Sequence, residues 1–197
     1  MATKTATKGK KKKSTNQGAG AGNTQLEKLF HDSLKDIYWA EKALTKALKK
    51  MMKNATTEQL QTAIEEHITQ TEGQIQRLEQ AFEIFGKKPQ AKKCEAMEGL
   101  IKEGESIMEE TEDGSMTRDV GIIMAAQKVE HYEIATYGSL VQLAYTMGQD
   151  DIAAILEETL EEEKQTDANL TAIAESDINW EAEMEDEGEE GEEEEEA

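Results

Sequence analysis

Four long stretches of this 197-residue chain place apolar residues at alternating steps of three and four. Such spacing puts the apolar residues on one face of an α-helix, because the helix completes a turn in about 3.6 residues. We expect helices over residues 24–53, 56–86, 115–147 and 150–176. Each has an apolar face that must be buried, so the sequence predicts an antiparallel helical bundle.

A shorter stretch with helical spacing lies between the second and third of these helices. Residues 95–110 offer five apolar contacts, Met97, Leu100, Ile101, Ile107 and Met108. The two outer connections between long helices are short, whereas the middle one is long. Two helix pairs joined by a long crossover form the ferritin-like arrangement. The predicted fold is therefore all-α, a ferritin-like antiparallel four-helix bundle with an extra short helix in the long crossover.

The predicted helix ends rest on specific local signals. Residues 24–27 and 56–59 both match the capping-box pattern, in which two side chains satisfy free backbone N–H groups at a helix start. Gly86 and Pro89 end the second helix, and Gly148 ends the third, since glycine and proline interrupt helices.

The two ends of the chain differ sharply from its body in charge. Residues 1–13 contain six lysines and no acid, while residues 181–197 contain twelve acids and no base. Neither end has enough apolar surface to offset the entropy lost on ordering. We expect a disordered Lys-rich tail over 1–22, a folded bundle over 23–177 and a disordered acidic tail over 178–197.

Composition also restricts the compartment and the partners. The single cysteine, Cys94, excludes an internal disulfide and fits a reducing compartment. No apolar run approaches the length of a membrane span, and no apolar stretch follows the N-terminal lysines as in a secretory signal. We therefore expect a cytoplasmic protein without membrane contact. A net charge of −21 disfavours nucleic-acid binding except through the Lys-rich tail.

An ionisable residue falls near the middle of each apolar helix face. These residues are Glu41 on the first helix, His67 on the second, Glu130 and Glu133 on the third and Glu163 on the fourth. An unpaired buried carboxylate is costly or takes up a proton, and several at one level repel one another. A bound cation offsets that cost. The sequence therefore predicts a metal site between the helices.

The ligand types indicate which metals suit the site. Carboxylate oxygens with one imidazole fit iron, manganese or zinc. Glu130 and Glu133 are three residues apart, so both can reach one ion or bridge two. Tyr137 lies one turn further along the same face, within reach of a hydrogen bond to a ligand.

Other readings of these residues lead to different functions. His67 alone is more often a core group than a ligand, and the acidic run 161–163 by itself is typical of a solvated face. A buried polar layer that only fixes helix register would make the chain a non-enzymatic stress or interaction module. A third possibility is a nucleoid-associated bundle that acts through the Lys-rich tail.

Several stretches resemble the YciE/YciF stress-protein family of the ferritin-like, rubrerythrin-related superfamily. They are residues 35–41, 67–71, 73–79, 94–101, 125–135 and 158–164, of which Gln127-Lys-Val-Glu-His-Tyr-Glu-Ile-Ala135 is the most specific. The resemblance covers about residues 24–176. It implies a ferritin-like bundle induced by stress and a homodimer. It assigns no biochemical activity; from the ligand types we hypothesise an iron site, with manganese or zinc as alternatives, for oxidation or peroxide handling.

The resemblance assigns ligands residue by residue. Glu130 and Glu133 match the Glu-x-x-Glu that serves the di-iron site of rubrerythrin-like proteins, and Glu41 matches their first-helix glutamate. Ferritin-like sites usually carry Glu-x-x-His on the other two helices. Here His67 is followed by Gln70, and Glu163 by Thr166 and Asp167. With Asp167 included as a candidate ligand, we expect one or two ions per chain.

Overall fold

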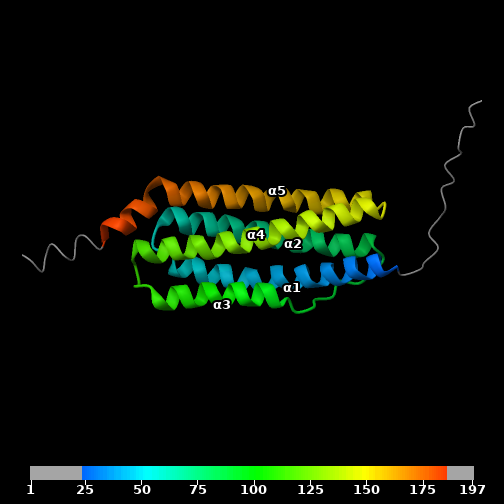
Figure 1. Ribbon diagram of the computed structural model, residues 1–197, viewed down its shortest axis with the longest axis horizontal. Helices are drawn as coiled ribbons and strands as arrows, with labels where there is room; N and C mark the ends of the chain where they lie inside the picture. Colours follow the sequence, from blue (N-terminus) through cyan, green and yellow to red (C-terminus); the bar gives the residue numbers. More distant parts are fainter. Residues whose placement is uncertain (1–23, 186–197) are drawn as a thin grey trace, which may run out of the picture.

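The computed structural model describes residues 24–185, and every regular element in that range is helical (Figure 1). The elements are α1 (Gln25–Asn54), α2 (Glu58–Ile84), α3 (Glu95–Glu110), α4 (Met116–Thr146) and α5 (Asp150–Ile173). The predicted all-α bundle is confirmed, and the extra helix in the crossover lies where the sequence placed it.

The long crossover determines the direction of α4, the third long helix. Short turns join α1 to α2 and α4 to α5, so each of these pairs is antiparallel (Figure 1). The crossover carries the chain back along α1 as α3, and α4 then runs in the same direction as α2. The predicted ferritin-like connectivity is therefore observed. Within the described range, no helix combines the length and apolar character needed to cross a lipid bilayer.

The starts of α1 and α2 are capped differently. Thr24 and Glu27 form the predicted capping box, with Glu27 N–H donating to Thr24 Oγ1 at 3.1 Å and Thr24 N–H donating to Glu27 Oε2 at 2.7 Å. The second predicted box is wrong. Thr57 rather than Thr56 caps α2, and its hydroxyl accepts from Leu60 N–H at 3.4 Å.

A buried carboxylate from α4 explains this difference. Asp119 accepts the backbone N–H of Thr56 at 2.6 Å, the N–H of Thr57 at 2.8 Å and the Thr57 hydroxyl at 2.7 Å. The side chain of Asp119 thus replaces the expected cap and ties the start of α2 to α4.

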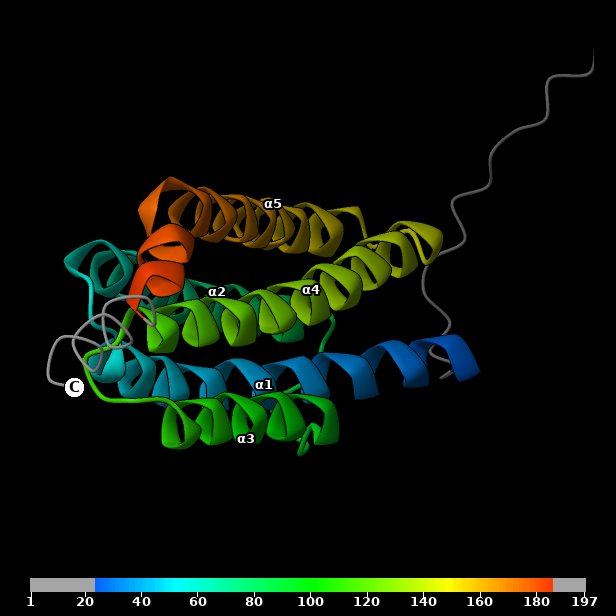
Figure 2. The same ribbon diagram turned by 60° about the vertical axis from the view of Figure 1, so that its left-hand side comes forward.

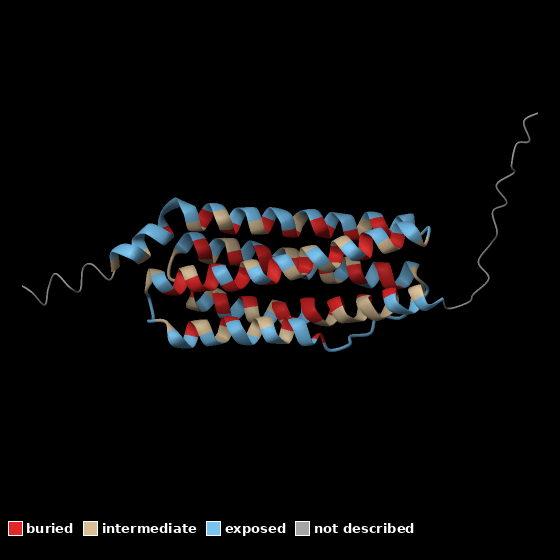
Figure 3. Cartoon of the chain, viewed as in Figure 1, coloured by how far each residue is buried: buried red, intermediate tan, exposed pale blue. Residues whose placement is uncertain are grey.

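The core follows the predicted apolar faces. Buried residues form stripes along the inner sides of the helices (Figure 3). Among the largest fully buried side chains are Phe30, Phe82, Leu34, Ile37, Leu44, Leu60, Leu78, Ile122, Ile123 and Leu140. On the outside of the bundle, α3 packs against α1 and α4. A Cβ atom added at Gly121 of α4 would lie 2.4 Å from Ile107 Cγ2 of α3, so the glycine permits this approach.

The predicted boundary at residue 177 is wrong. After α5 the chain forms a π-helical turn, Ala174–Ile178, and continues as helix to residue 185, bending toward the start of α4 (Figure 2). Ile178 is buried against the core, and Glu185 accepts the backbone N–H groups of Met116 at 2.5 Å and Thr117 at 3.1 Å. The Lys-rich tail and the rest of the acidic tail, residues 186–197, lie outside the described residues.

Cys94 has a structural position. It is buried at the start of α3, where Sγ accepts Met97 N–H at 3.3 Å and lies 3.1 Å from the Tyr132 hydroxyl. Burial raises the pKa of the thiol, which disfavours the reactive thiolate.

Candidate metal centre

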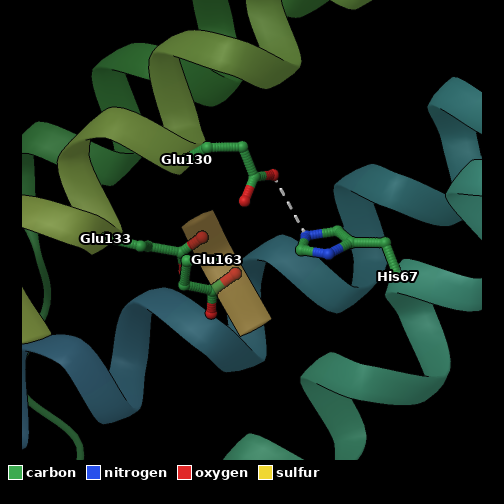
Figure 4. Close-up of side chains that lie close together, drawn as sticks. All are labelled: His67, Glu130, Glu133 and Glu163. Carbon is green, nitrogen blue, oxygen red and sulfur yellow. Dashed lines mark ion pairs between the residues drawn. The ribbon is translucent and has the colours of Figure 1, made fainter. Parts of the chain in front are cut away.

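Three helices bring four potential metal ligands together in the middle of the bundle. His67 projects from α2, Glu130 and Glu133 from α4 and Glu163 from α5, and their side chains point toward one another (Figure 4). One potential ligand atom from each residue lies within 4.8 Å of the others. The sequence prediction that separate helix faces meet at one level thus agrees with the geometry of these four residues.

These four side chains are almost completely removed from solvent. Glu133 and Glu163 have no exposed surface, while Glu130 is 1% and His67 is 4% exposed. His67 Nε2 and Glu130 Oε1 are separated by 3.3 Å (Figure 4).

Most of the polar atoms of the cluster have no protein partner. Both oxygens of Glu133 and of Glu163 lack a hydrogen bond, as do Oε2 of Glu130 and Nδ1 of His67. Buried polar groups in proteins are normally paired, because an unpaired one loses its hydration without compensation. Oxygen atoms with one imidazole nitrogen also match the preferences of iron, manganese and zinc. The residues present therefore fit a bound divalent cation.

Burial and mutual repulsion shift the acid–base properties of the cluster. Burial raises the pKa of Glu133 well above its usual range, and the charges of Glu41 and Glu163 add to the effect. Burial and the Glu163 charge also raise the pKa of Glu130 well above its usual range. Burial raises the pKa of Glu163 to about 7. A cation stabilises the ionised carboxylates and opposes these shifts.

The histidine is held in the form that binds metals. Burial lowers the pKa of His67 to about 4, with a smaller opposing effect from the Gln70 side chain. The imidazole is therefore neutral near pH 7, and a neutral imidazole can donate a nitrogen lone pair to an ion.

Glu41 lies at the edge of this cluster rather than within the group of four. The Tyr137 hydroxyl donates a hydrogen bond to its Oε1, while its Oε2 has no partner. Burial and the Glu163 charge raise the pKa of Glu41. Glu41 thus remains a candidate fifth carboxylate, and Tyr137 occupies the supporting position that its spacing predicted.

Asp167 is not retained as a ligand. Its Oδ1 accepts a hydrogen bond from Gln127 Nε2 at 3.3 Å and lies 3.4 Å from His131 Nε2. The carboxylate is partly exposed and lies outside the group of four. It lies one turn beyond Glu163 on α5, and its carboxylate is directed to Gln127 and His131 of α4.

The cluster is flanked by a polar network, and the sequence had not indicated that this network belongs to the site. Arg77 donates from Nε to Thr159 Oγ1 at 3.0 Å and pairs through Nη2 with Glu162. Gln74 Nε2 donates to Glu162 Oε2 at 3.1 Å. The Arg77 charge lowers the pKa of both Glu41 and Glu163, which favours their ionised forms. Arg77 gave no sequence signal, because its role depends on α5 lying alongside α2.

The fold and the buried carboxylate cluster define a ferritin-like helical bundle with a candidate metal centre. Comparison with known proteins then identifies the family: residues 25–183 match the family described as a domain of unknown function, DUF892, and the chain belongs to this family. The chain is 46% identical over 159 residues to Protein YciF of Escherichia coli strain K12, covering 80% of this chain and 95% of that protein. The predicted resemblance to YciF-like stress proteins is confirmed.

Solved structures agree with this assignment. The crystal structure of the E. coli stress protein YciF matches with a TM-score of 0.75, 46% identity and coverage of 79% of this chain and 98% of that chain. YcfI from Rhodopseudomonas palustris matches with a TM-score of 0.73 and 40% identity over 78% of this chain and 97% of its own. A Xanthomonas campestris protein, 22% identical with a TM-score of 0.64, covers 82% of this chain and 99% of its own and shows the shared fold alone.

Proposed function

We propose that this chain is a stress-associated protein that binds iron, or manganese, between its helices and uses the metal in oxidation or peroxide handling. The observation that carries the proposal is the set of buried, unpartnered oxygens on Glu130, Glu133 and Glu163 beside neutral His67. Family membership supports the association with stress, because the relative YciF is described as a stress protein.

The charge of the cluster sets a limit on the number of ions. Glu41, Glu130, Glu133 and Glu163, when ionised, supply four negative charges, which balance two divalent cations. Glu130 and Glu133 would bridge or share the ions, while His67 and Glu163 would hold them from the opposite helices. Two iron(II) ions bound there would supply the two electrons that, with two protons, convert hydrogen peroxide into two water molecules.

The surrounding side chains provide the conditions for this chemistry. The carboxylates are positioned before an ion arrives, since helices on separate sides of the core fix them. Tyr137 holds one oxygen of Glu41 in place and leaves the other available. The apolar residues above and below exclude bulk water from the centre.

Metal analysis of protein purified without chelator tests the proposal directly. We expect a metal-to-chain ratio near one or two for the wild type and near zero for Glu130→Gln/Glu133→Gln. Iron(II) oxidation, followed by ferric absorbance with hydrogen peroxide or oxygen, should be lost in the same variant. Wild-type protein that neither contains nor takes up iron, manganese or zinc would disprove the proposal.

A non-enzymatic stress or interaction module is the alternative function. It is favoured by Gln70 and Thr166, which occupy positions where a fuller ligand set would carry acidic or histidine side chains. Instead, the Thr166 hydroxyl donates to Gln70 Oε1 at 3.3 Å. Equal melting temperatures with and without added metal would support this alternative, in which the polar layer only fixes helix register.

We also propose that the chain forms a homodimer. Trp180 is 69% exposed and Met184, one turn further along the same helix, is 59% exposed, so both are available for contact. Met124 on α4 adds another exposed apolar side chain. Light scattering after size-exclusion chromatography should give twice the chain mass, and Trp180→Ala/Met184→Ala should shift it toward the monomer.

A further inference from the structure

A small cavity between α2 and α5 reaches the side of the metal centre that is least buried. Its volume is about 40 Å³, and His67 and Glu130 form part of its lining. These are also the two members of the four-residue cluster that retain some exposed surface, whereas Glu133 and Glu163 retain none. The cavity therefore meets the cluster at the His67–Glu130 pair.

The lining residues change in exposure from the outside inward. Glu66 of α2 and Asn169 of α5 are exposed and form the rim. Ala63 and Gln70 are half-buried, and Thr166 is 8% exposed. The cavity thus extends from exposed residues to the buried cluster.

Gln70 of α2 and Thr166 of α5 line the cavity from opposite helices. Thr166 Oγ1 lies 3.3 Å from Gln70 Oε1 and 3.1 Å from the Glu162 carbonyl oxygen, so its single proton has two competing acceptors. Both side chains can rotate without changing the backbone. The carboxylate of Glu66 at the rim adds negative charge that attracts cations.

We propose that this cavity is the access route to the metal centre and that its size restricts access to single ions and molecules as small as hydrogen peroxide. The inference rests on the proposed function. A space of about 10–15 Å³ is enough for one water molecule, so the cavity holds a few atoms and excludes an organic hydroperoxide. Gln70 and Thr166 line this route between the exposed residues and the cluster.

Uptake of Co²⁺ tests the route without requiring catalysis, because the visible absorbance of Co²⁺ reports its coordination. Ala63→Phe and Asn169→Phe place a large side chain in the opening from opposite walls, and Asn169 is exposed, so its replacement leaves the core intact. Ala43→Phe is the matched control, since Ala43 is a half-buried alanine in a separate groove between α1 and α3.

We expect both route variants to take up Co²⁺ about tenfold more slowly, equivalent to about 1.4 kcal/mol in the barrier. Removal by chelator should be slowed by the same factor, and the final Co²⁺-to-chain ratio should be unchanged. Ala43→Phe should behave like the wild type. Unchanged rates in both route variants would overturn the access route alone, whereas no Co²⁺ uptake by the wild type would overturn the metal centre with it.

A second measurement tests the size limit. In protein loaded with iron(II), hydrogen peroxide should oxidise the iron. The bulkier tert-butyl hydroperoxide should react at least about tenfold more slowly, which again corresponds to about 1.4 kcal/mol in the activation barrier. Equal rates for the two oxidants would contradict the restriction on size.

Discussion

The hydroxyl of Tyr137 donates a hydrogen bond to Oε1 of Glu41, and neither side chain has any exposed surface. The two residues lie on α4 and α1, so this bond joins helices that are distant in sequence. It also fixes the orientation of a carboxylate at the edge of the candidate metal centre.

Replacing Tyr137 by phenylalanine should destabilise the protein by about 1–3 kcal/mol, because the buried carboxylate of Glu41 loses its donor. Urea unfolding measures the change. Tyr38→Phe is the matched control: its hydroxyl donates to Glu79 Oε1 at 2.7 Å, and Glu79 is exposed and can be rehydrated. If Tyr137→Phe lowered the free energy of unfolding no more than Tyr38→Phe does, the hydrogen bond from Tyr137 to Glu41 would not stabilise the protein as proposed.

Glu163 should make the stability of the metal-free protein depend on pH. Burial raises its pKa from 4.5 to about 7, so the folded protein binds more protons than the unfolded chain between these values. Its contribution to stability is therefore lost as pH rises from about 4.5 to 7. As pH rises from about 4.5 to 7, the free energy of unfolding of Glu163→Gln should increase by up to about 3 kcal/mol relative to that of the wild type.

The comparison between variant and wild type separates Glu163 from His67. The pKa of His67 is lowered to about 4, so His67 destabilises the folded state as pH falls from about 6.5 to 4. The effect of His67 on stability is present in both the wild type and Glu163→Gln, so it largely cancels when their free energies of unfolding are subtracted. Parallel stability profiles for the two proteins across pH 4.5–7 would show that Glu163 does not titrate as expected.

Added metal should stabilise the protein near neutral pH and much less in acid. Mn²⁺ at about 100 times its dissociation constant should add about 2.7 kcal/mol to the free energy of unfolding. Because binding requires ionised carboxylates, the gain should decline at about pH 5, where the protons compete. Thermal melting at both pH values, with Glu130→Gln/Glu133→Gln as the control, measures this effect.

Asp119 should be more important for stability than its position near the surface end of α4 suggests. Its carboxylate accepts three hydrogen bonds from Thr56 and Thr57 at the start of α2. Asp119→Ala leaves these donors without their partner and should lower the free energy of unfolding by about 2–4 kcal/mol. Chemical denaturation measures the loss, and a change below about 0.5 kcal/mol would show that water replaces the carboxylate.

Two glycine substitutions should have opposite effects. Gly73→Ala meets no atom within 4 Å and should stabilise its helix by about 0.5–1 kcal/mol. Gly121→Ala brings Cβ to 2.4 Å from the branched Ile107 side chain and should destabilise by about 1–3 kcal/mol. If thermal melting showed Gly121→Ala to be stabilising, α3 would not be held closely against α4.

The sequence was sufficient to predict those features that follow from local periodicity. Glu41, His67, Glu130, Glu133 and Glu163 were found because each interrupts an apolar helix face at its middle. Asp167 lies one turn from Glu163 on α5 but contacts Gln127 and His131 instead of joining the group of four, which its spacing alone could not show.

Features that depend on contacts between distant segments could not be predicted in the same way. Asp119 caps a helix about sixty residues away, and nothing near it in the sequence indicates that role. The acidic composition after residue 177 suggested disorder. In the structure, burial of Ile178 and capping of α4 by Glu185 continue the helix to residue 185.

The position of Glu163 on α5 has a consequence for the protein during synthesis. His67 and the α4 carboxylates leave the ribosome earlier, but the four-residue cluster is complete only when α5 adds Glu163. Their dehydration occurs when the last long helix closes the bundle, and that step takes up either protons or a cation. Under the proposed function, acquisition of the ion would thereby be confined to a nearly complete chain.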